Sequence, residues 1–290
     1  MSAGEAKIGG VEPVSRGRGF TLPWGRWGVR GAAISYLLLM IVLPLSSILV
    51  SGLHDGLGAF WQDVTNNVAL GALRLTLMTA IITTAINLVM GTLTAYVLVR
   101  YEFPGRSLLN AVVDMPFAIP TLVTGVMLVV LYGPQRILGA WLESHGIQII
   151  FATPGIVLAL LLVTYPFVVR TVQPVLMELD KAQEEAAYTI GASKWTTFRT
   201  IVLPSITPAI ITGSLLSFAR ALGEFGSIII VAGNIPGRTL TAPVYVFGQL
   251  ESYNARGASA MSILLLALSF SLILIVDWMQ RRWDIHYATP

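Results

Sequence analysis

Long apolar stretches are the feature that most constrains how this chain can fold. Six segments each hold about 20 or more mostly apolar residues, the length that an α-helix needs to cross the hydrocarbon core of a bilayer. They cover roughly residues 32–53, 69–99, 107–132, 149–169, 206–232 and 259–278. The chain is therefore predicted to be an all-α polytopic membrane protein with about six transmembrane helices.

The composition excludes several other classes of protein. Of the 290 residues, 11% are charged and 55% are hydrophobic, and the mean hydropathy is +0.75. Soluble domains carry about 25% charged residues. The chain has no cysteine, which excludes a disulfide scaffold or a thiolate metal site, and its three histidines are scattered. We therefore expect no metal site in this chain.

The distribution of lysine and arginine predicts the orientation in the membrane. With both termini in the cytoplasm, the opposite side keeps only Arg136, Arg238 and Arg256 among the basic residues outside the spans. This is the positive-inside pattern. The same pattern explains the net charge of +3, so no nucleic-acid partner is expected. The lipid bilayer is expected to surround the helices.

The first apolar segment is predicted to be a retained helix. Its apolar run is longer than the about 7–15 residues of a signal-peptide h-region, and no A-x-A cleavage site follows it. We expect a cytoplasmic, poorly ordered tail over 1–30 and the first transmembrane helix over 31–54. The sequence also predicts two local features, a bend within a span and a short helix outside the spans. Pro116 and Pro120 predict a bend in the third span, and residues 242–250 are a candidate short helix at the outer membrane surface.

The loop between the fourth and fifth spans has its own local structure. Residues 182–190 are good helix formers, Gly191 suits the left-handed end of a helix, and Ser193 suits the N-cap of a second helix. Ala186 and Ala187 leave the first helix thin enough to enter a groove on a partner. The alternative is an interfacial helix that merely joins two spans.

The spacing within this loop resembles a known motif. Every fixed position of the E-A-A-x3-G-x9-I-x-L-P signature of ATP-binding-cassette importer permeases is present, and the positions singled out are Glu185, Ala186, Ala187, Gly191, Leu203 and Pro204. The resemblance implies a coupling helix around 180–203, seated in a cleft of a cytoplasmic ATPase. It also implies the type I importer fold with a core over 67–277, followed by a cytoplasmic tail over 278–290.

Five further segments carry a resemblance to one family: residues 100–106, 114–121, 165–175, 218–227 and 232–236. They are similar to the sulfate/thiosulfate permeases, and the stretches 170–175 and 234–236 favour the T-type chain. That resemblance implies uptake of sulfate or thiosulfate by alternating access in a bacterial inner (plasma) membrane. It implies as partners two copies of the ATPase, a related W-type permease and an extracytoplasmic binding protein. A molybdate or tungstate permease is the alternative.

Charged residues within the apolar spans are candidates for a translocation path, because charge is costly inside a bilayer. Arg220 and Glu224 lie four residues apart in the fifth span, near its middle. At 100° per residue, one narrow helix stripe collects them with small and polar neighbours. A structural ion pair that locks helices together is the equally weighted alternative. The stripe contains Gly213, Ser217, Arg220, Glu224 and Ser227.

Arg74 in the second span and Asp114 in the third are weaker candidates for the same path. Asp114 lies about two turns inside its span, where it can instead snorkel or cap the bend beside it.

Catalytic motifs were not found in the sequence. There is no G-x-x-x-x-G-K-[ST] phosphate loop, no H-E-x-x-H and no Ser/His/Asp set. We therefore expect a permease subunit that is not itself an enzyme and has no cofactor of its own, with ATP and magnesium bound by the partner ATPase. An anion channel and a membrane-embedded enzyme are the alternatives from other classes.

Overall fold

The computed structural model describes residues 23–287, and the side chains of residues 27–281. Every regular element in this part of the chain is a helix. The chain divides into two units, Met1–Ser47 and Ile48–Pro290. Most of the expected tail over 1–30 lies outside the described residues, and the first helix already begins at Pro23.

The first span is one long apolar helix. It consists of α1 (Pro23–Leu37), a π-helical turn (Leu38–Val42) and α2 (Leu43–Leu53), the last of which continues into the second unit. The apolar part, Trp27–Leu53, is long enough to cross a membrane. It contains the whole of the first predicted span.

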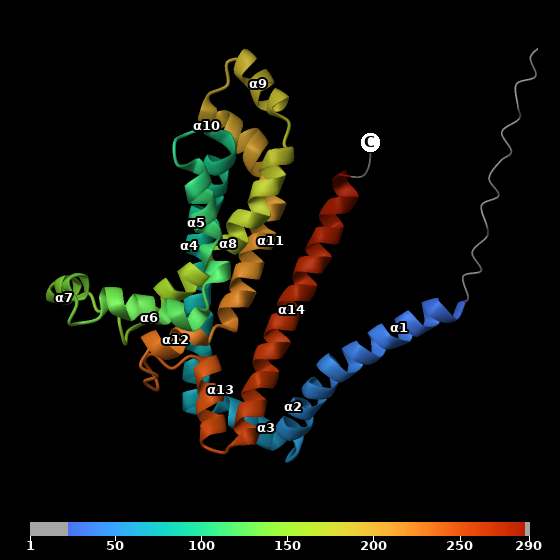
Figure 1. The fold of residues 1–290 in the computed structure, drawn as a ribbon, viewed down its shortest axis with the longest axis vertical. Coiled ribbons are helices and arrows are strands. Elements are labelled where there is room, and N and C mark those ends of the chain that lie inside the picture. The colour runs from blue at the N-terminus through green and yellow to red at the C-terminus, as the bar shows by residue number, and fades with distance from the viewer. Residues whose placement is uncertain (1–22, 288–290) are drawn as a thin grey trace, which may run out of the picture. The chain divides into compact units, whose positions relative to one another are not determined.

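Three long helices form the centre of the second unit: α4 (Asn67–Arg100), α8 (Thr153–Glu178) and α11 (Leu203–Leu222). Figure 1 shows them side by side. They approach closely at two glycines that face Val168 of α8. A Cβ on Gly91 of α4 would lie 2.9 Å from Cβ of Val168, and a Cβ on Gly213 of α11 would lie 3.0 Å from Cα of Val168. A buried cluster that includes Leu98, Val172 and Ile206 fills the contact.

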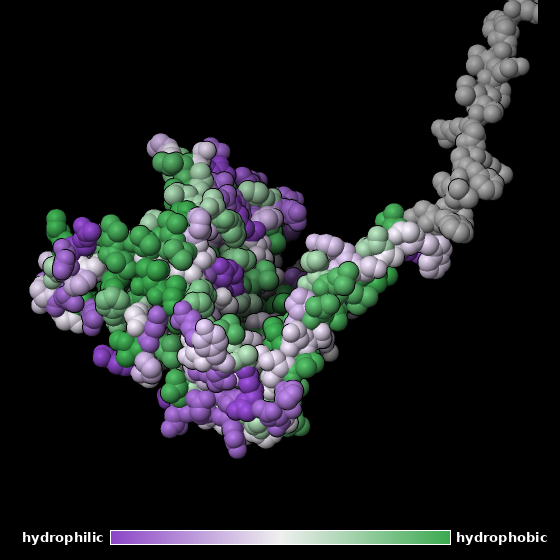
Figure 2. Space-filling view, turned by 60° about the horizontal axis from the view of Figure 1, so that its bottom comes forward, coloured by the Kyte–Doolittle hydropathy of each residue, from purple (hydrophilic) through white to green (hydrophobic). Residues whose placement is uncertain are grey.

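The third predicted span is sharply broken. The helices α5 (Arg106–Ala118) and α6 (Thr121–Tyr132) meet at 112°, with Pro116 inside α5 and Pro120 in the break. The predicted bend is thus confirmed. The arm formed by α6 and α7 (Ile137–Ser144) points away from the three central helices (Figure 1). Figure 2 shows hydrophobic side chains over much of this arm. Val126, Met127 and Val130 of α6 are among the exposed hydrophobic residues.

The fifth predicted span, residues 206–232, is not one helix, and that prediction was wrong. The helix α11 ends at Leu222, and a separate short helix, α12 (Gly226–Val231), follows after three residues. Gly223 breaks the helix, and the Glu224 side chain accepts a hydrogen bond from the backbone N–H of Ser227 in the first turn of α12. The carboxylate of Glu224 thus satisfies one backbone N–H in the first turn of α12.

The loop before α11 and the last span are also helical. The helices α9 (Lys181–Thr189) and α10 (Lys194–Thr197) lead through a π-helical turn (Phe198–Val202) into α11. The last span lies within α14 (Ala255–Tyr287). In Figure 1, α9 lies at one end of the unit, which we call the α9 end.

Short helices gather at the opposite end, which we call the α13 end (Figure 1). The helix α13 (Ala242–Glu251) confirms the predicted helix over 242–250, whereas α3 (Gly56–Thr65) and α7 were not predicted. Arg256 at the start of α14 joins Asp55 at 2.6 Å and Asp63 at 2.8 Å. Hydrogen bonds from His54 and then from Arg256 hold the pKa of the Asp55 carboxyl below its usual value.

Candidate functional site

The break after α11 holds a close ion pair. An Nη2 atom of Arg220, two residues before the end of α11, lies 2.7 Å from Oε2 of Glu224, which stands in the break. The Glu224 side chain is 1% exposed, whereas 34% of the Arg220 side chain remains exposed. The predicted neighbours therefore do meet, and part of the Arg220 side chain stays exposed beside the buried carboxylate.

The second oxygen of Glu224 holds the start of α12. Its Oε1 atom accepts hydrogen bonds from the Ser227 backbone N–H at 2.9 Å and from the Ser227 hydroxyl at 2.8 Å. A carboxylate at a helix N-terminus is favoured by the orphan N–H groups and the helix dipole. The single helical stripe that was predicted does not exist, but the break brings Arg220, Glu224 and Ser227 together.

The two broken spans touch at their breaks. Thr121 and Gly226 are the first residues of α6 and α12, and a Cβ on Gly226 would lie 2.3 Å from Oγ1 of Thr121. Further along the crossing, a Cβ on Gly125 would lie 2.6 Å from the carbonyl oxygen of Ser227. Because neither glycine has room for a side chain, the position of α12 and its ion pair depends on α6.

Ser217 belongs to the packing of the central helices. It is fully buried and accepts a long hydrogen bond, 3.5 Å, from the Asn87 side-chain amide, which also donates to Thr164 Oγ1 at 2.8 Å. These contacts tie α4, α8 and α11 together at one depth. Asn87 was not predicted as a site residue, and Ser217, a predicted candidate for the path, is buried beside it.

Asp114 is held by an arginine of α8. Its Oδ1 atom lies 2.6 Å from Nε of Arg170, while the other nitrogens of this guanidinium donate to Asn110 side-chain and backbone oxygens at 2.9 and 2.8 Å and to the Gln173 side chain. The arginine therefore clamps α5 onto α8. Asp114 is not brought together with Arg220 by any contact among the described residues, and its geometry favours a lock between helices.

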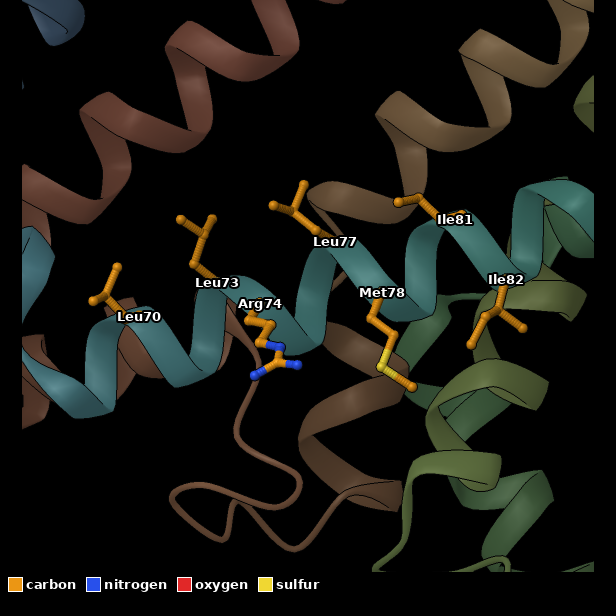
Figure 3. Close-up of a pocket in the computed structure, with 7 residues that line it drawn as sticks. All are labelled: Leu70, Leu73, Arg74, Leu77, Met78, Ile81 and Ile82. Atoms are coloured by element: carbon orange, nitrogen blue, oxygen red, sulfur yellow. The ribbon is translucent and has the colours of Figure 1, made fainter.

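Arg74 lies on an exposed, otherwise apolar face of α4. Figure 3 shows its guanidinium on the same side of the helix as Met78, in a shallow hollow of about 480 Å³ lined by α4 residues alone. No acidic side chain within residues 27–281 forms an ion pair with it. Arg74 therefore has no ion-pair contact with Glu224 among the described residues.

The predicted helix–turn–helix in the α9 loop is confirmed. Asp180 caps α9, Gly191 has a φ of +87°, and the Ser193 hydroxyl accepts a hydrogen bond from the Thr196 backbone N–H at 3.1 Å. Of the motif residues on α9, Glu185 and Ala186 are exposed and Ala187 is buried. Leu203 and Pro204 form the first turn of α11.

One contact of this loop was not predicted. Glu184, next to the motif, forms a buried ion pair with Arg100 at the end of α4. The two residues are far apart in the sequence, so their contact could not be read from it. The helical register of α9 gives the only local indication, because it turns Glu184 inward and Glu185 outward. Among the described residues, no three His, Asp or Glu side chains gather in a way that would hold a metal ion.

Comparison with known proteins identifies the family. Residues 87–285 match the family described as "Binding-protein-dependent transport system inner membrane component". The chain belongs to this family. The match to this family of permeases begins within α4, includes the α9 loop and both breaks, and ends within α14.

Relatives of this permease have names that specify a transported ion. It is 44% identical to a probable sulfate transport system permease protein CysT of Nephroselmis olivacea, over 85% of this chain and 87% of that protein. It is 42% identical to the sulfate transport system permease protein CysT of Synechocystis, over 92% and 91% of the two chains. The Escherichia coli protein of that name is 39% identical, over 91% and 94%.

Solved structures support the fold of the permease. A bacterial alginate ABC transporter with its periplasmic protein contains a chain that superposes with a TM-score of 0.75 at 18% identity, covering 90% of this chain and 95% of that one. The MetNI methionine ABC transporter in an inward-facing conformation gives 0.55 at 19% identity, over 73% and 94%. The fold is that of type I ABC importer permeases, as predicted.

Proposed function

We propose that this permease is the T-type membrane subunit of an ATP-driven importer of sulfate, with thiosulfate as a second substrate. The observation that carries the proposal is its 39–44% identity, over most of both chains, to permeases named for sulfate transport. The subunit is not an enzyme, and hydrolysis of magnesium-bound ATP belongs to two copies of a separate ATPase. An extracytoplasmic binding protein delivers the anion.

Uptake of labelled sulfate tests this function. A bacterial strain that lacks its own sulfate permease is given the complete transporter, with or without this subunit. We expect uptake and growth on sulfate only when the subunit is present, with competition by unlabelled thiosulfate. Competition by molybdate or tungstate, together with failure to import sulfate, would identify the other oxyanion class instead.

Arg220 is the residue that we assign to the anion. An oxyanion that leaves water needs hydrogen-bond donors and positive charge, and a guanidinium offers five donors and stays charged when buried. We assign these donors to the guanidinium of Arg220, whose side chain is 34% exposed, while Glu224 fixes the arginine and moderates its charge. Ser227 positions Glu224. Arg74 and Asp114 remain weaker candidates for the same path.

Coupling to ATP hydrolysis is assigned to the α9 loop. Glu185 and Ala186 are exposed on α9 and are free to enter a cleft of the ATPase. Closure of the two ATPase subunits on ATP would then move α9 and rock the core over 67–277, which opens the path alternately to either side.

Replacing Gly191 by valine tests this coupling. A β-branched residue resists the φ of +87°, so the turn between α9 and α10 should distort. We expect the ATPase to dissociate, or to hydrolyse ATP without sulfate uptake. The matched control is Gly146→Val, which places the same strain at a φ of +76° in the turn after α7. Normal uptake by the Gly191→Val variant would contradict the assignment of α9.

A second, W-type permease is proposed to cover the apolar face of the α6 arm. Hydrophobic side chains are exposed along α6, and an apolar groove of about 650 Å³ lies between α4, α5, α6 and α8. Because the chain has no cysteine, a single Val126→Cys substitution gives a clean cross-linking probe. We expect cross-links to the W-type chain. A disulfide between two copies of this chain in an active complex would contradict the heterodimer.

The permease is proposed to be a multi-pass protein of the bacterial inner membrane, with both tails in the cytoplasm. This orientation places the α9 end inside and the α13 end outside. Single cysteines at Glu102, just after the end of α4, and at Tyr253, which are both exposed, test it with a membrane-impermeant thiol reagent. We expect Tyr253→Cys to react in intact spheroplasts and Glu102→Cys to react only after permeabilisation.

A further inference from the structure

A buried ion pair joins α9 to the end of α4. An Nη2 atom of Arg100, the last residue of α4, lies 2.6 Å from Oε1 of Glu184 in the first turn of α9. The two side chains are only 8% and 10% exposed. A charge that is buried in this way needs its partner, because each ion has given up its hydration.

Other contacts fix the arginine but do not replace the carboxylate. An Nη2 atom of Arg100 also approaches the Leu179 carbonyl oxygen at 3.5 Å, and no group among the described residues accepts a hydrogen bond from its Nε. One turn earlier on α4, the ring of Tyr96 packs edge-on against Phe198, with 5.3 Å between ring centroids. The end of α4 therefore contacts both parts of the loop, α9 through charge and the turn after α10 through aromatic rings.

The chain on either side of α9 is not helical. Leu179 and Asp180 separate α9 from α8 in an extended conformation, and the left-handed Gly191 separates it from α10. Such joints bend more readily than a continuous helix. A sideways attachment of α9 to a long helix is therefore needed if α9 is to move as one body with the membrane core.

The helix α4 connects this attachment to the candidate site. It is 34 residues long and runs from Arg100 at the α9 end toward the α13 end. At mid-length, its Asn87 donates hydrogen bonds to Thr164 of α8 and Ser217 of α11. Ser217 stands one turn before Arg220, so a shift of α4 is passed to the helix that carries the ion pair at the break.

We propose that Arg100 and Glu184 are positioning residues that transmit the movement of α9 into α4, and that their ion pair sets how many anions are transported per ATP hydrolysed. The proposal rests on the proposed function of α9 as the contact with the ATPase. It concerns a link within this chain, whereas the exposed Glu185 faces the partner.

The test uses the complete transporter in proteoliposomes, with transport per ATP hydrolysed as the measurement. The variants are Glu184→Gln and Arg100→Gln, which each remove one charge, and the charge reversal R100E/E184R. Asp277→Asn is the control, because Asp277 forms an exposed ion pair with Arg281 at 2.9 Å on α14. The ratio is measured with whichever oxyanion the parent complex transports.

We expect both single variants to retain the ATPase and to hydrolyse ATP, but to lose at least tenfold in transport per ATP. The charge reversal should recover at least half of the parent ratio, and Asp277→Asn should keep it. If the single variants do not assemble, recovery by the charge reversal supports the pair, and its absence overturns the proposal.

Unchanged transport per ATP in the assembled single variants would overturn the inference. This holds even where the rates of transport and of ATP hydrolysis fall together, because a merely structural role lowers both rates alike. A parent complex that imports no sulfate would contradict the proposed function instead. The two failures are therefore seen in different measurements.

Discussion

The double variant R220Q/E224Q is expected to assemble with its partners but to lose sulfate uptake by about tenfold to hundredfold. Removing both charges leaves no unpaired ion in the protein, and glutamine at 224 keeps an oxygen that can accept the hydrogen bonds of Ser227. The loss comes from the hydrogen bonds between Arg220 and the anion, since charged hydrogen bonds contribute about 1.5–3 kcal/mol. Uptake is measured beside the yield of purified complex.

The single variant Arg220→Ala separates the role in transport from the role in stability. It leaves Glu224, whose side chain is 1% exposed, without its cation. We expect the free energy of unfolding to fall by about 3 kcal/mol. This is the low end for breaking a buried ion pair, because Arg220 is itself partly exposed. Complex yield and Tm should therefore fall in Arg220→Ala but not in the double variant.

An equally spaced pair on α14 provides the control for these variants. Arg281 and Asp277 are also four residues apart and 2.9 Å from each other, but both are exposed. The variant R281Q/D277N should keep both yield and uptake. Parent-rate uptake by an assembled R220Q/E224Q complex would remove Arg220 from the path.

Predictions that depend on local chemistry agree with the structure. The lengths of the apolar segments locate α4, α8 and α14, because an apolar helix of this length is specified by its own residues. Gly191 and Ser193 locate the turn in the α9 loop, since a left-handed glycine and a hydroxyl cap act over a few residues only. The bend near Pro116 follows from the missing N–H of proline.

The features that were missed depend on contacts between distant segments. The apolar character of residues 206–232 concealed the break at Gly223, although Glu224 and Ser227 have the spacing of a cap and the first turn of a helix. No local pattern gives the partners of these charges. Arg170 meets Asp114 because α5 packs on α8, and Arg100 meets Glu184 because α9 lies against the end of α4.

Valine at Gly125 is expected to cause a large loss of stability. Its Cβ would lie 2.6 Å from the Ser227 carbonyl oxygen and 2.9 Å from Cβ of Ile230. Neither atom is the far end of a flexible side chain, so α6 and α12 must separate. Overpacking of a core typically costs about 1–3 kcal/mol of folding free energy, and we expect the upper end of that range here. Tm and yield of the purified complex should both fall.

The same substitution should also reduce uptake, because α12 carries the N–H and hydroxyl of Ser227 that hold Glu224 beside Arg220. Gly125→Ala should give the same change in a weaker form, since alanine adds the clashing Cβ without its two methyl groups. Gly71→Val is the matched control, because a Cβ on Gly71 of α4 meets nothing within 4 Å. If Gly125→Val assembles with the yield and Tm of the parent, α6 and α12 do not cross at these residues, and the dependence of the ion pair on α6 is wrong.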